Sequence, residues 1–417
     1  MPKPVVLIVI LSLLAGLLGA CNLPASLTIT PSSAPPARIA ANTAPPPTAR
    51  PTPIPTPAPA IHLDQIHMLT ASAGWGWAPT ATNTRQLLRT SDGGQSWKDV
   101  SPPGNYDYYG SFFLNPQTAW LSFYNTNTST GGLLRTSDGG QNWQTLPSTE
   151  IPQNTWFEFS SPNLGVAETA SMGAGNAYIN YYQTSDGGAT WQPIIITPPT
   201  PQPDLPAGTL HLCNICADNL YYHPDRTIIT YGDMASDPTG LLRISISTDL
   251  GQHWKDLQIP LPDKYAAGSV MPLTPSFFGL SGLLPVNLTK YNPDGSLAFS
   301  VLLLYTTQDG GLNWQAAPAG LESQQPQTNT IQILSMQDVF IRCGQNLCAT
   351  HDGAQTWHEL PSSLNFDQSA PATDYVSQTS FIDASTGWAI TGETGSTTLW
   401  HTTNGAQTWQ KLLAVGS

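Results

Sequence analysis

An eight-residue box that occurs seven times constrains this chain more than any other feature. The first copy reads TSDGGQSW over residues 90–97, and every copy ends in tryptophan. Successive tryptophans lie 46, 48, 63, 60, 43 and 52 residues apart. A period near fifty residues is typical of propellers and solenoids. The acidic or amide position and the tryptophan of the seven copies are Asp92, Trp97, Asp138, Trp143, Asp186, Trp191, Asp249, Trp254, Asp309, Trp314, Asp352, Trp357, Asn404 and Trp409.

The residue types of the box predict a β-turn between two strands. Alternating apolar runs flank each copy, which is the pattern of a hairpin. The aspartate can accept hydrogen bonds from turn N–H groups, glycine supplies the positive φ, and tryptophan provides apolar area between neighbouring sheets. Asn404 can accept the same bonds, so the seventh copy should fold like the others. We therefore expect an all-β, seven-bladed β-propeller over residues 61–417, with four-stranded antiparallel blades and the box between the third and fourth strands.

This pattern resembles the Asp-box or BNR repeat of sialidases and sortilin-type propellers. It is similar above all to the photosystem II assembly-factor propellers, in which a Gly-Trp-Ala-type strand also precedes the box. Here such strands include residues 74–78, 118–121, 164–167 and 387–390. The resemblance covers about residues 61 to 412 and implies the fold. It implies little about function, because the box is structural wherever the family is known.

The N-terminal region has the pattern of an exported, anchored protein. Residues 5–18 form an apolar run that is short for a membrane span and fits a signal-peptide core. The sequence LGAC at 18–21 resembles a bacterial lipobox, which implies a signal peptide over 1–20 and lipid attachment at Cys21; an ordinary secretory signal is the alternative. Residues 21–60 are rich in Pro, Thr, Ala and Ser, which predicts a disordered tether. We expect an extracytoplasmic lipoprotein on the outer face of a bacterial membrane.

The charge balance restricts the partners. The chain has 14 basic and 27 acidic residues and a formal net charge of −13. This balance argues against nucleic acid and against an anionic lipid surface as partners. The expected contacts are the membrane, through the lipid, and an envelope protein or a glycan. We expect a monomer without a cofactor.

Four further cysteines form two local pairs, Cys213 with Cys216 and Cys343 with Cys348. An oxidising exterior favours disulfides, and the second pair flanks a very short loop between two expected strands. Four cysteines allow three connectivities. A zinc site made by all four thiolates and a redox-active pair at Cys213 and Cys216 are the alternatives; we expect no metal.

Antiparallel order places all boxes on one side of the blades, together with the first-to-second turns. The opposite side should carry long irregular segments at 101–110, 147–156, 197–208, 286–297 and 316–330, and long loops on a rigid scaffold often bind ligands. A single ring there more often packs on its blade, but the set favours a binding face. The candidate ligand-binding residues are Tyr106, Tyr108, Tyr109, Tyr124, Trp156, Tyr178, Glu168, Asp233 and Glu393. Because the ordered part starts on a first strand and stops after a fourth near Leu412, the blades should close without strand exchange between the termini.

The sequence assigns no catalytic residue. A sialidase-like site would need an arginine cluster, but Arg89 and Arg135 occupy the same place before a box and look like repeat residues. Glycoside hydrolysis needs two carboxylates at a defined separation, whereas Glu168 and Glu393 recur at matching places, which suggests a structural role. We therefore expect a binding, scaffold or assembly-factor module. The alternative is an exo-sialidase-like glycoside hydrolase, and a third possibility is a purely structural envelope protein.

Overall fold

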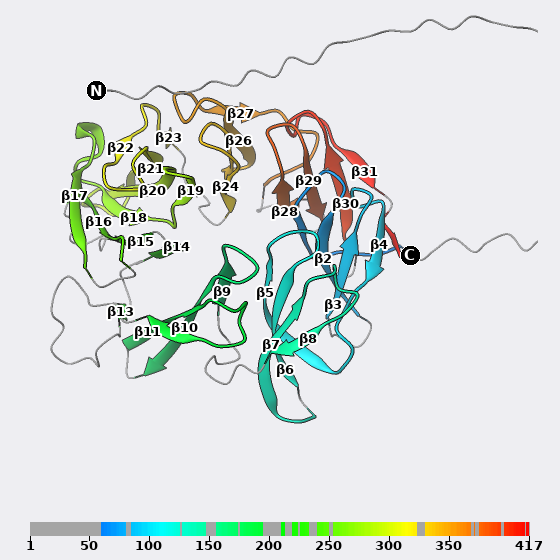
Figure 1. Cartoon of the computed structure of the whole chain (residues 1–417). Coiled ribbons are helices and arrows are strands. Elements are labelled where there is room, and N and C mark those ends of the chain that lie inside the picture. The colour runs from blue at the N-terminus through cyan, green and yellow to red at the C-terminus, as the bar shows by residue number, and fades with distance from the viewer. Residues whose placement is uncertain are drawn as a thin grey trace, which may run out of the picture. The chain divides into compact units, whose positions relative to one another are not determined.

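The computed structural model describes residues 60–80, 85–125, 127–146, 156–173, 176–194, 210–212, 219–223, 226–232, 240–249, 253–322, 330–367, 371, 375–392, 396–412 and 414–416. These residues form seven separate sheets, one for each box, in which all strand pairs but one are antiparallel (Figure 1). Within each sheet the main strands follow one another in chain order and form a meander of neighbouring hairpins, and additional strands join the sheets of blades 1, 3 and 5. The predicted seven-bladed β-propeller is confirmed.

Blades 1, 2, 6 and 7 each contain a meander of four strands. Blade 1 consists of β1 (Gln65–Met68), β2 (Gly74–Pro79), β3 (Arg85–Thr90) and β4 (Ser96–Asp99). Blade 2 consists of β5 (Tyr106–Phe113), β6 (Ala119–Asn125), β7 (Thr130–Thr136) and β8 (Gln144–Leu146). Blade 6 consists of β24 (Gln332–Ile333), β25 (Val339–Cys343), β26 (Asn346–Thr350) and β27 (His358–Leu360). Blade 7 consists of β28 (Val376–Phe381), β29 (Gly387–Thr391), β30 (Thr398–Thr402) and β31 (Gln410–Leu412).

Blades 3, 4 and 5 lie around the two longest spacings between boxes, 63 and 60 residues. Blade 3 consists of β9 (Trp156–Phe159), β10 (Gly165–Gly173), β11 (Asn176–Thr184) and β12 (Gln192–Ile194), and β13 (Leu210–Leu212) also pairs with β11. Blade 4 consists of β14 (Asn219–His223), β15 (Arg226–Tyr231), β16 (Leu241–Ser247) and β17 (Lys255–Pro260), followed by the short helix η1 (Asp263–Tyr265). In blade 5, β18 (Ser269–Pro272) and β19 (Ser276–Phe278) pair with β20 (Ser281–Tyr291); β21 (Leu297–Thr307) pairs with β20, β22 (Gln315–Ala316) and β23 (Leu321–Glu322).

Two segments predicted as irregular loops are strands. Residues 286–291 continue β20, and only residues 292–296 form the turn to β21, closed by a bond from Asn292 N to Ser296 O of 2.8 Å. The reason is that alternate residues on this hairpin, such as Val286 and Leu288, are fully buried. Within 101–110, β5 already begins at Tyr106. The expectation of long loops at these two places was therefore wrong.

Each box closes its turn through its polar side chains. In the first copy, Asp92 Oδ1 accepts bonds from Ser96 N and Thr90 Oγ1, both at 2.9 Å, and Oδ2 accepts from Ser96 Oγ at 2.6 Å. The N–H of Gly93 donates to Ser72 O, in the turn between the first two strands, at 2.8 Å. The box and this turn thus lie on the same side of the blade, as predicted. Asn404 Oδ1 accepts from Thr408 N at 3.0 Å, so the amide replaces the carboxylate as expected.

Aromatic side chains fill the space between neighbouring blades. Trp97 is 1 % exposed and packs in a cluster with Trp388 and Leu399 of blade 7. The rings of Trp120 and Phe159 stack at 3.7 Å between blades 2 and 3. Burial of such large rings is the main stabilising contribution available to a propeller, because one small sheet cannot form a core alone.

The two ends of the described domain meet at blade 1. All four strands of blade 7 come from one continuous segment, as expected. The chain then returns, and β32 (Val415–Gly416) pairs in parallel with β4, which makes blade 1 five-stranded (Figure 1). Ile61 N donates to Ala414 O at 2.9 Å beside it. The expectation that the blades close without strand exchange between the termini was therefore wrong, because the last residues add a strand to blade 1. Among the described residues no helix is long and apolar enough to cross a membrane.

Candidate ligand-binding site between blades 6 and 7

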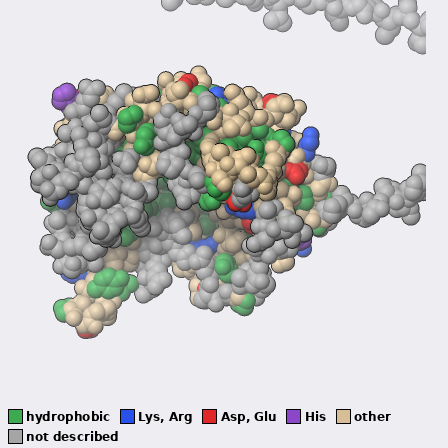
Figure 2. Space-filling model, turned by 90° about the horizontal axis from the view of Figure 1, so that it is seen from below, with side chains coloured by type: hydrophobic (Ala, Val, Ile, Leu, Met, Phe, Trp, Pro, Cys, Tyr) green, Lys and Arg blue, Asp and Glu red, His purple; other side chains and the backbone are tan. Residues whose placement is uncertain are grey.

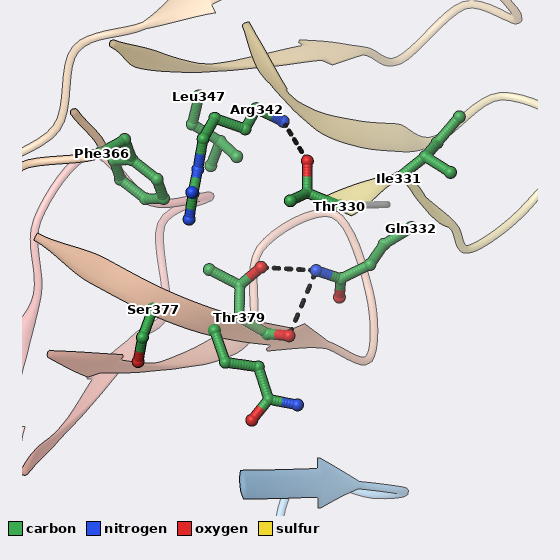
Figure 3. Close-up of a pocket in the computed structure, with 9 residues that line it drawn as sticks. Thr330, Ile331, Gln332, Arg342, Leu347, Phe366, Ser377 and Thr379 are labelled. Carbon is green, nitrogen blue, oxygen red and sulfur yellow. Dashed lines mark hydrogen bonds between the residues drawn. The ribbon is translucent and has the colours of Figure 1, made fainter. Parts of the chain in front are cut away.

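A cavity of about 240 Å³ lies where β24 and β25 of blade 6 face β28 of blade 7 (Figure 3). Hydroxyl and amide side chains from both blades surround one cationic and three apolar side chains. No Asp or Glu is among the described residues that line it. The lining residues are Thr330, Ile331, Gln332, Arg342, Leu347, Phe366, Ser377, Gln378 and Thr379.

Arg342 occupies a position that can be compared in all seven blades. In each second strand, one residue pairs with the first residue of the box, and the position of interest lies three residues later. The equivalent residues of blades 1 to 7 are Trp77, Ser122, Glu168, Thr230, Pro285, Arg342 and Ile390. The fold accepts aromatic, aliphatic, hydroxyl and acidic side chains here. The positive charge in blade 6 is therefore not a requirement of the propeller.

The Arg342 side chain is held between the two blades. It is 3 % exposed, and its Nη2 donates to the carbonyl oxygen of Val376 on β28 at 2.6 Å. Its backbone N–H donates to Thr330 Oγ1 at 3.1 Å (Figure 3). Burial lowers the pKa of the guanidinium, but an arginine remains charged at neutral pH. The cavity thus has a fixed cation in its wall.

Two glutamines join the first strands of neighbouring blades. Gln332 accepts from Phe381 N at 2.8 Å and donates to Thr379 O at 3.3 Å, from blade 6 to blade 7. Gln378 accepts from Ile66 N at 2.9 Å and donates to Ile66 O at 3.0 Å, from blade 7 to blade 1. A first strand has one edge without a strand partner, and these amides supply hydrogen bonds that another strand would otherwise make.

A second cavity, of about 200 Å³, lies at blades 1 and 2 and shares Gln378 with the first. Its wall includes Trp77, His67 and Phe113. His67 keeps accessible atoms, yet the protein around it desolvates the ring and lowers its pKa, so it is neutral at pH 7. This cavity offers an aromatic surface and no fixed charge.

The predicted aromatic residues do not form one site. Tyr106 and Tyr108 lie on β5 and pack down, with the ring of Tyr108 5.2 Å from that of Trp77, and burial raises the pKa of Tyr108. Tyr124 is half-buried on β6. Tyr109 and Trp156 remain 52 % and 51 % exposed, on different blades. Tyr106 and Tyr108 therefore pack on their blade and do not present their rings to a ligand.

Glu168 has an unexpected neighbour on blade 3. In the register of β9 and β10, Glu168 pairs with Trp156, and Glu158 lies two residues further along β9. All three side chains therefore project from one face of the sheet. Glu158 keeps accessible atoms, but the surrounding protein desolvates both carboxyl groups and raises the pKa of Glu158 and of Glu168. Diagonal positions of this kind have Cβ atoms about 7 Å apart, so two weakly acidic carboxyl groups lie beside an exposed indole.

Several other candidates lie outside the described residues. Asp233, Glu393, Cys213, Cys216 and Cys21 belong to this group, and Tyr178 is described only as part of the backbone of β11. Cys343 and Cys348 form a disulfide across the β25–β26 hairpin. Within the described part of the chain, His, Cys, Asp and Glu form no group of three or more that could hold a metal ion.

Charged side chains are sparse on the described surface. On the face seen in Figure 2, Lys and Arg side chains and Asp and Glu side chains lie scattered and are not gathered into a field of one sign. Arg342, Phe366 and Gln332 belong to no motif that marks them as site residues in the sequence. The available signal for Arg342 was its place in the second strand, where the other copies have no cation.

The chain is similar to several solved β-propellers. A structure of YCF48 bound to D1 peptide has 16% sequence identity and a TM-score of 0.42, over 84% of this chain and 95% of that chain. An ulvan lyase of polysaccharide lyase family PL25 has 8% identity and a TM-score of 0.47, over 85% and 96%. The β-propeller domain of the trilobed protease from Pyrococcus furiosus has 9% identity and a TM-score of 0.44, over 83% and 94%. No protein-family model and no curated protein matches the chain.

Proposed function

We propose that this protein is a lipid-anchored, extracytoplasmic binding module that holds a glycan or an envelope protein close to the membrane. The observation that carries the proposal is the cavity with Arg342 in its wall. Its cation stands at a repeat position where the other six blades have none, and the bond to the Val376 carbonyl holds it in the wall of the cavity. Ligand sites usually combine an enclosed surface with a few placed polar groups.

The anchor is part of the same proposal and rests on the lipobox-like sequence before Cys21. A tether over 21–60 would let the propeller reach partners beside the membrane. The Cys21→Ser variant should lose labelling by a radioactive fatty acid and leave the membrane fraction. Retention of both in the variant would contradict lipid attachment at this residue.

The binding role is tested with two measurements on the full chain in detergent: a glycan array and a pull-down from envelope extract of the host. We expect one of them to give a specific signal that is reduced in the Arg342→Met variant. The matched control is Arg135→Met, because Arg135 lies half-buried over the Trp120 ring, away from the cavity. If neither the glycan array nor the pull-down gives a specific signal, the proposed binding role is wrong.

A second candidate function, glycoside hydrolysis, is favoured by Glu158 and Glu168. A proton donor with raised pKa and a second carboxylate within about 5–10 Å are the needs of such an enzyme. The exposed Trp156 beside them could support a sugar ring. Turnover of a panel of aryl glycosides by the wild type and its absence in Glu168→Gln would support this function, whereas no turnover by the wild type excludes it for the sugars in the panel.

A further inference from the structure

We propose that the cavity between blades 1 and 2 binds one neutral sugar unit, which the protein holds through two adjacent hydroxyl groups of the sugar ring. Arg342 does not line this cavity, so the site goes beyond the function proposed above and does not depend on it. The free edge of each first strand carries the evidence, because the protein covers this edge with its own side chains in two blades and leaves it open in a third.

In blade 1 the free edge of the first strand is covered by side chains of blade 7. Along a strand in an antiparallel pair, the N–H and C=O groups of alternate residues point to the partner strand, and those of the residues between them point outward. The outward groups of β1 belong to Ile66 and Met68. The carboxamide of Gln378 bonds both the N–H and the C=O of Ile66, at 2.9 and 3.0 Å, and Ser380 Oγ accepts from Met68 N at 3.0 Å. A donor and an acceptor side by side on one small group thus satisfy this edge.

In blade 2 the corresponding edge lacks this cover. The bond from Leu114 N to Thr118 O sets the alternation in β5, so the outward groups are those of Ser111 and Phe113. Among the residues that the structure describes, no side chain bonds these backbone groups. Water or a ligand must therefore supply their partners, and both residues line the cavity of about 200 Å³.

The opposite wall of the cavity offers further unused polar groups. In the register of their blades, Gln65 and His67 stand where Gln378 and Ser380 stand in blade 7. Within the described part of the chain, neither side chain makes a hydrogen bond. The His67 ring lies 5.7 Å from that of Phe113, and an uncharged imidazole has one donor and one acceptor nitrogen. A ligand that fills the cavity therefore needs donors and acceptors on two sides.

A neutral sugar ring meets these needs. Two hydroxyl groups on neighbouring ring carbons place a donor and an acceptor side by side, as the carboxamide of Gln378 does at the edge of blade 1. Hydroxyl groups elsewhere on the ring can bond Gln65 and His67, and the ring C–H groups can pack on the Phe113 ring. No Asp, Glu, Lys or Arg is among the described lining residues, so a charged ligand would lose its hydration without gaining an ionic partner.

The short length of the open edge argues against a peptide strand as the ligand. A peptide that adds to a sheet uses a row of N–H and C=O groups along an edge strand. In β5 the register shifts between Tyr108 and Gly110 and the strand ends at Phe113, so the regular open edge is confined to Ser111 and Phe113. The volume of about 200 Å³ is also below the range of pockets for drug-sized ligands, roughly 300–1,000 Å³.

The test is isothermal titration calorimetry of the full chain in a zwitterionic detergent, because a detergent with a sugar head group would compete for the site. The probes are the methyl glycosides of glucose, galactose and mannose, methyl glucuronoside, acetamide, and an acetal of the best neutral binder that joins its two adjacent hydroxyl groups. We expect at least one neutral glycoside to bind. Its acetal, which has lost the two O–H donors, and the charged glucuronoside should each bind at least about tenfold more weakly.

The variant His67→Phe keeps a ring beside Phe113 and removes both nitrogens, so it should bind the neutral glycoside about fivefold more weakly. The matched control is His401→Phe, because His401 lies half-buried on β30 with its ring 4.8 Å from that of Trp388, away from the cavity. This control and Arg342→Met should both bind the sugar like the wild type.

The outcomes separate this site from the function proposed for the Arg342 cavity. The sugar site is wrong if no neutral glycoside binds, if the acetal or the glucuronoside binds as tightly as the neutral parent, or if His67→Phe keeps the wild-type affinity. Binding of acetamide alone would also overturn it, because the edge would then select a carboxamide. A positive titration with a blank glycan array and pull-down would leave this site in place while the function proposed for the Arg342 cavity fails, and the reverse result would remove only this site. The comparison of glycoside with acetal uses the wild type, so it decides even if the variant does not fold.

Discussion

The indole N–H of Trp388 donates a hydrogen bond to the carbonyl oxygen of Gly93 at 2.9 Å, and so joins the second strand of blade 7 to the box of blade 1. Trp120 makes the corresponding bond from blade 2 to Gly187 in the box of blade 3, also at 2.9 Å. A second-strand tryptophan thus does more than fill space, because it fixes the position of the next blade's turn.

Trp388→Phe should destabilise the protein by about 2 kcal/mol, through the lost bond and a small cavity. Its control is Trp191→Phe, because Trp191 bonds Gly188 of its own box at 3.1 Å and links no blades by that bond. Denaturant unfolding gives the free energies, and hydrogen exchange gives the location of the effect. Only Trp388→Phe should speed exchange in β4 and β31. Identical exchange patterns in the two variants would contradict this role.

Gly140→Ala should cost more than Gly295→Ala, although both residues have almost the same φ, +82° and +83°. An added Cβ at 140 would lie 2.6 Å from Val100 Cβ, whereas nothing lies within 4 Å of one at 295. Both variants carry the strain of positive φ, about 1–2 kcal/mol, and only the first adds overpacking of about 1–3 kcal/mol. Urea unfolding of the pair measures the difference. Equal losses of stability would show that the structure around Val100 relaxes to accommodate the added Cβ.

Stability should fall as pH drops from about 4 to about 2. Partial burial raises the pKa of the Asp186 carboxyl, but bonds from Thr190 and Thr184 outweigh it and bring the pKa to about 2. A carboxyl with a depressed folded-state pKa stabilises above its unfolded-state pKa, near 4, and loses this contribution as pH falls through the folded-state value. Asp186→Asn, which imitates Asn404, should lose less stability across this window. Asp107→Asn, on an exposed part of β5, controls for the change in charge and should lose as much stability across this window as the wild type. If Asp107→Asn loses as little stability as Asp186→Asn, the pH dependence does not come from Asp186.

The double variant Cys343→Ala, Cys348→Ala should be less stable by about 2 kcal/mol, the chain-entropy value for so short a loop. In a Cys213→Ser, Cys216→Ser background, a reducing agent should lower the stability of the protein with Cys343 and Cys348 by a similar amount and leave the protein without them unchanged. Sensitivity of the protein without Cys343 and Cys348 to the reductant would mean that this disulfide is not responsible for the effect.

The sequence predicts the blades well because the information is local. A box of eight residues contains the carboxylate or amide, the glycines and the tryptophan that build one turn, so even Asn404 and the altered copies were interpreted correctly. The strand order and the common side of boxes and first turns follow from antiparallel hairpins. Tyr106 and residues 286–291 were wrongly placed in loops, because strand extension there depends on burial against a neighbouring blade, as for Val286 and Leu288.

The candidate site was less accessible to prediction. Arg342, Phe366 and Ser377 come together only because blade 6 packs on blade 7, and no local pattern joins them. Glu158 and Glu168 share a face of the sheet because of the register between β9 and β10. The sequence pattern does not reveal this register. Residue type alone also does not separate surface rings from packed ones: Tyr106 and Tyr108 pack against the core cluster of blades 1 and 2.

The pairing of β32 with β4 has a consequence for the order of folding. Each blade is a meander of adjacent strands and can form from a few tens of neighbouring residues, whereas the contacts of Ile61 with Ala414 and of Gly93 with Trp388 join distant parts of the chain. Loop-closure entropy makes such distant contacts slow to form. During synthesis blade 1 gains its fifth strand only when the last residues of the chain have been made, and a chain interrupted before blade 7 would hold the assembled blades in an open arc.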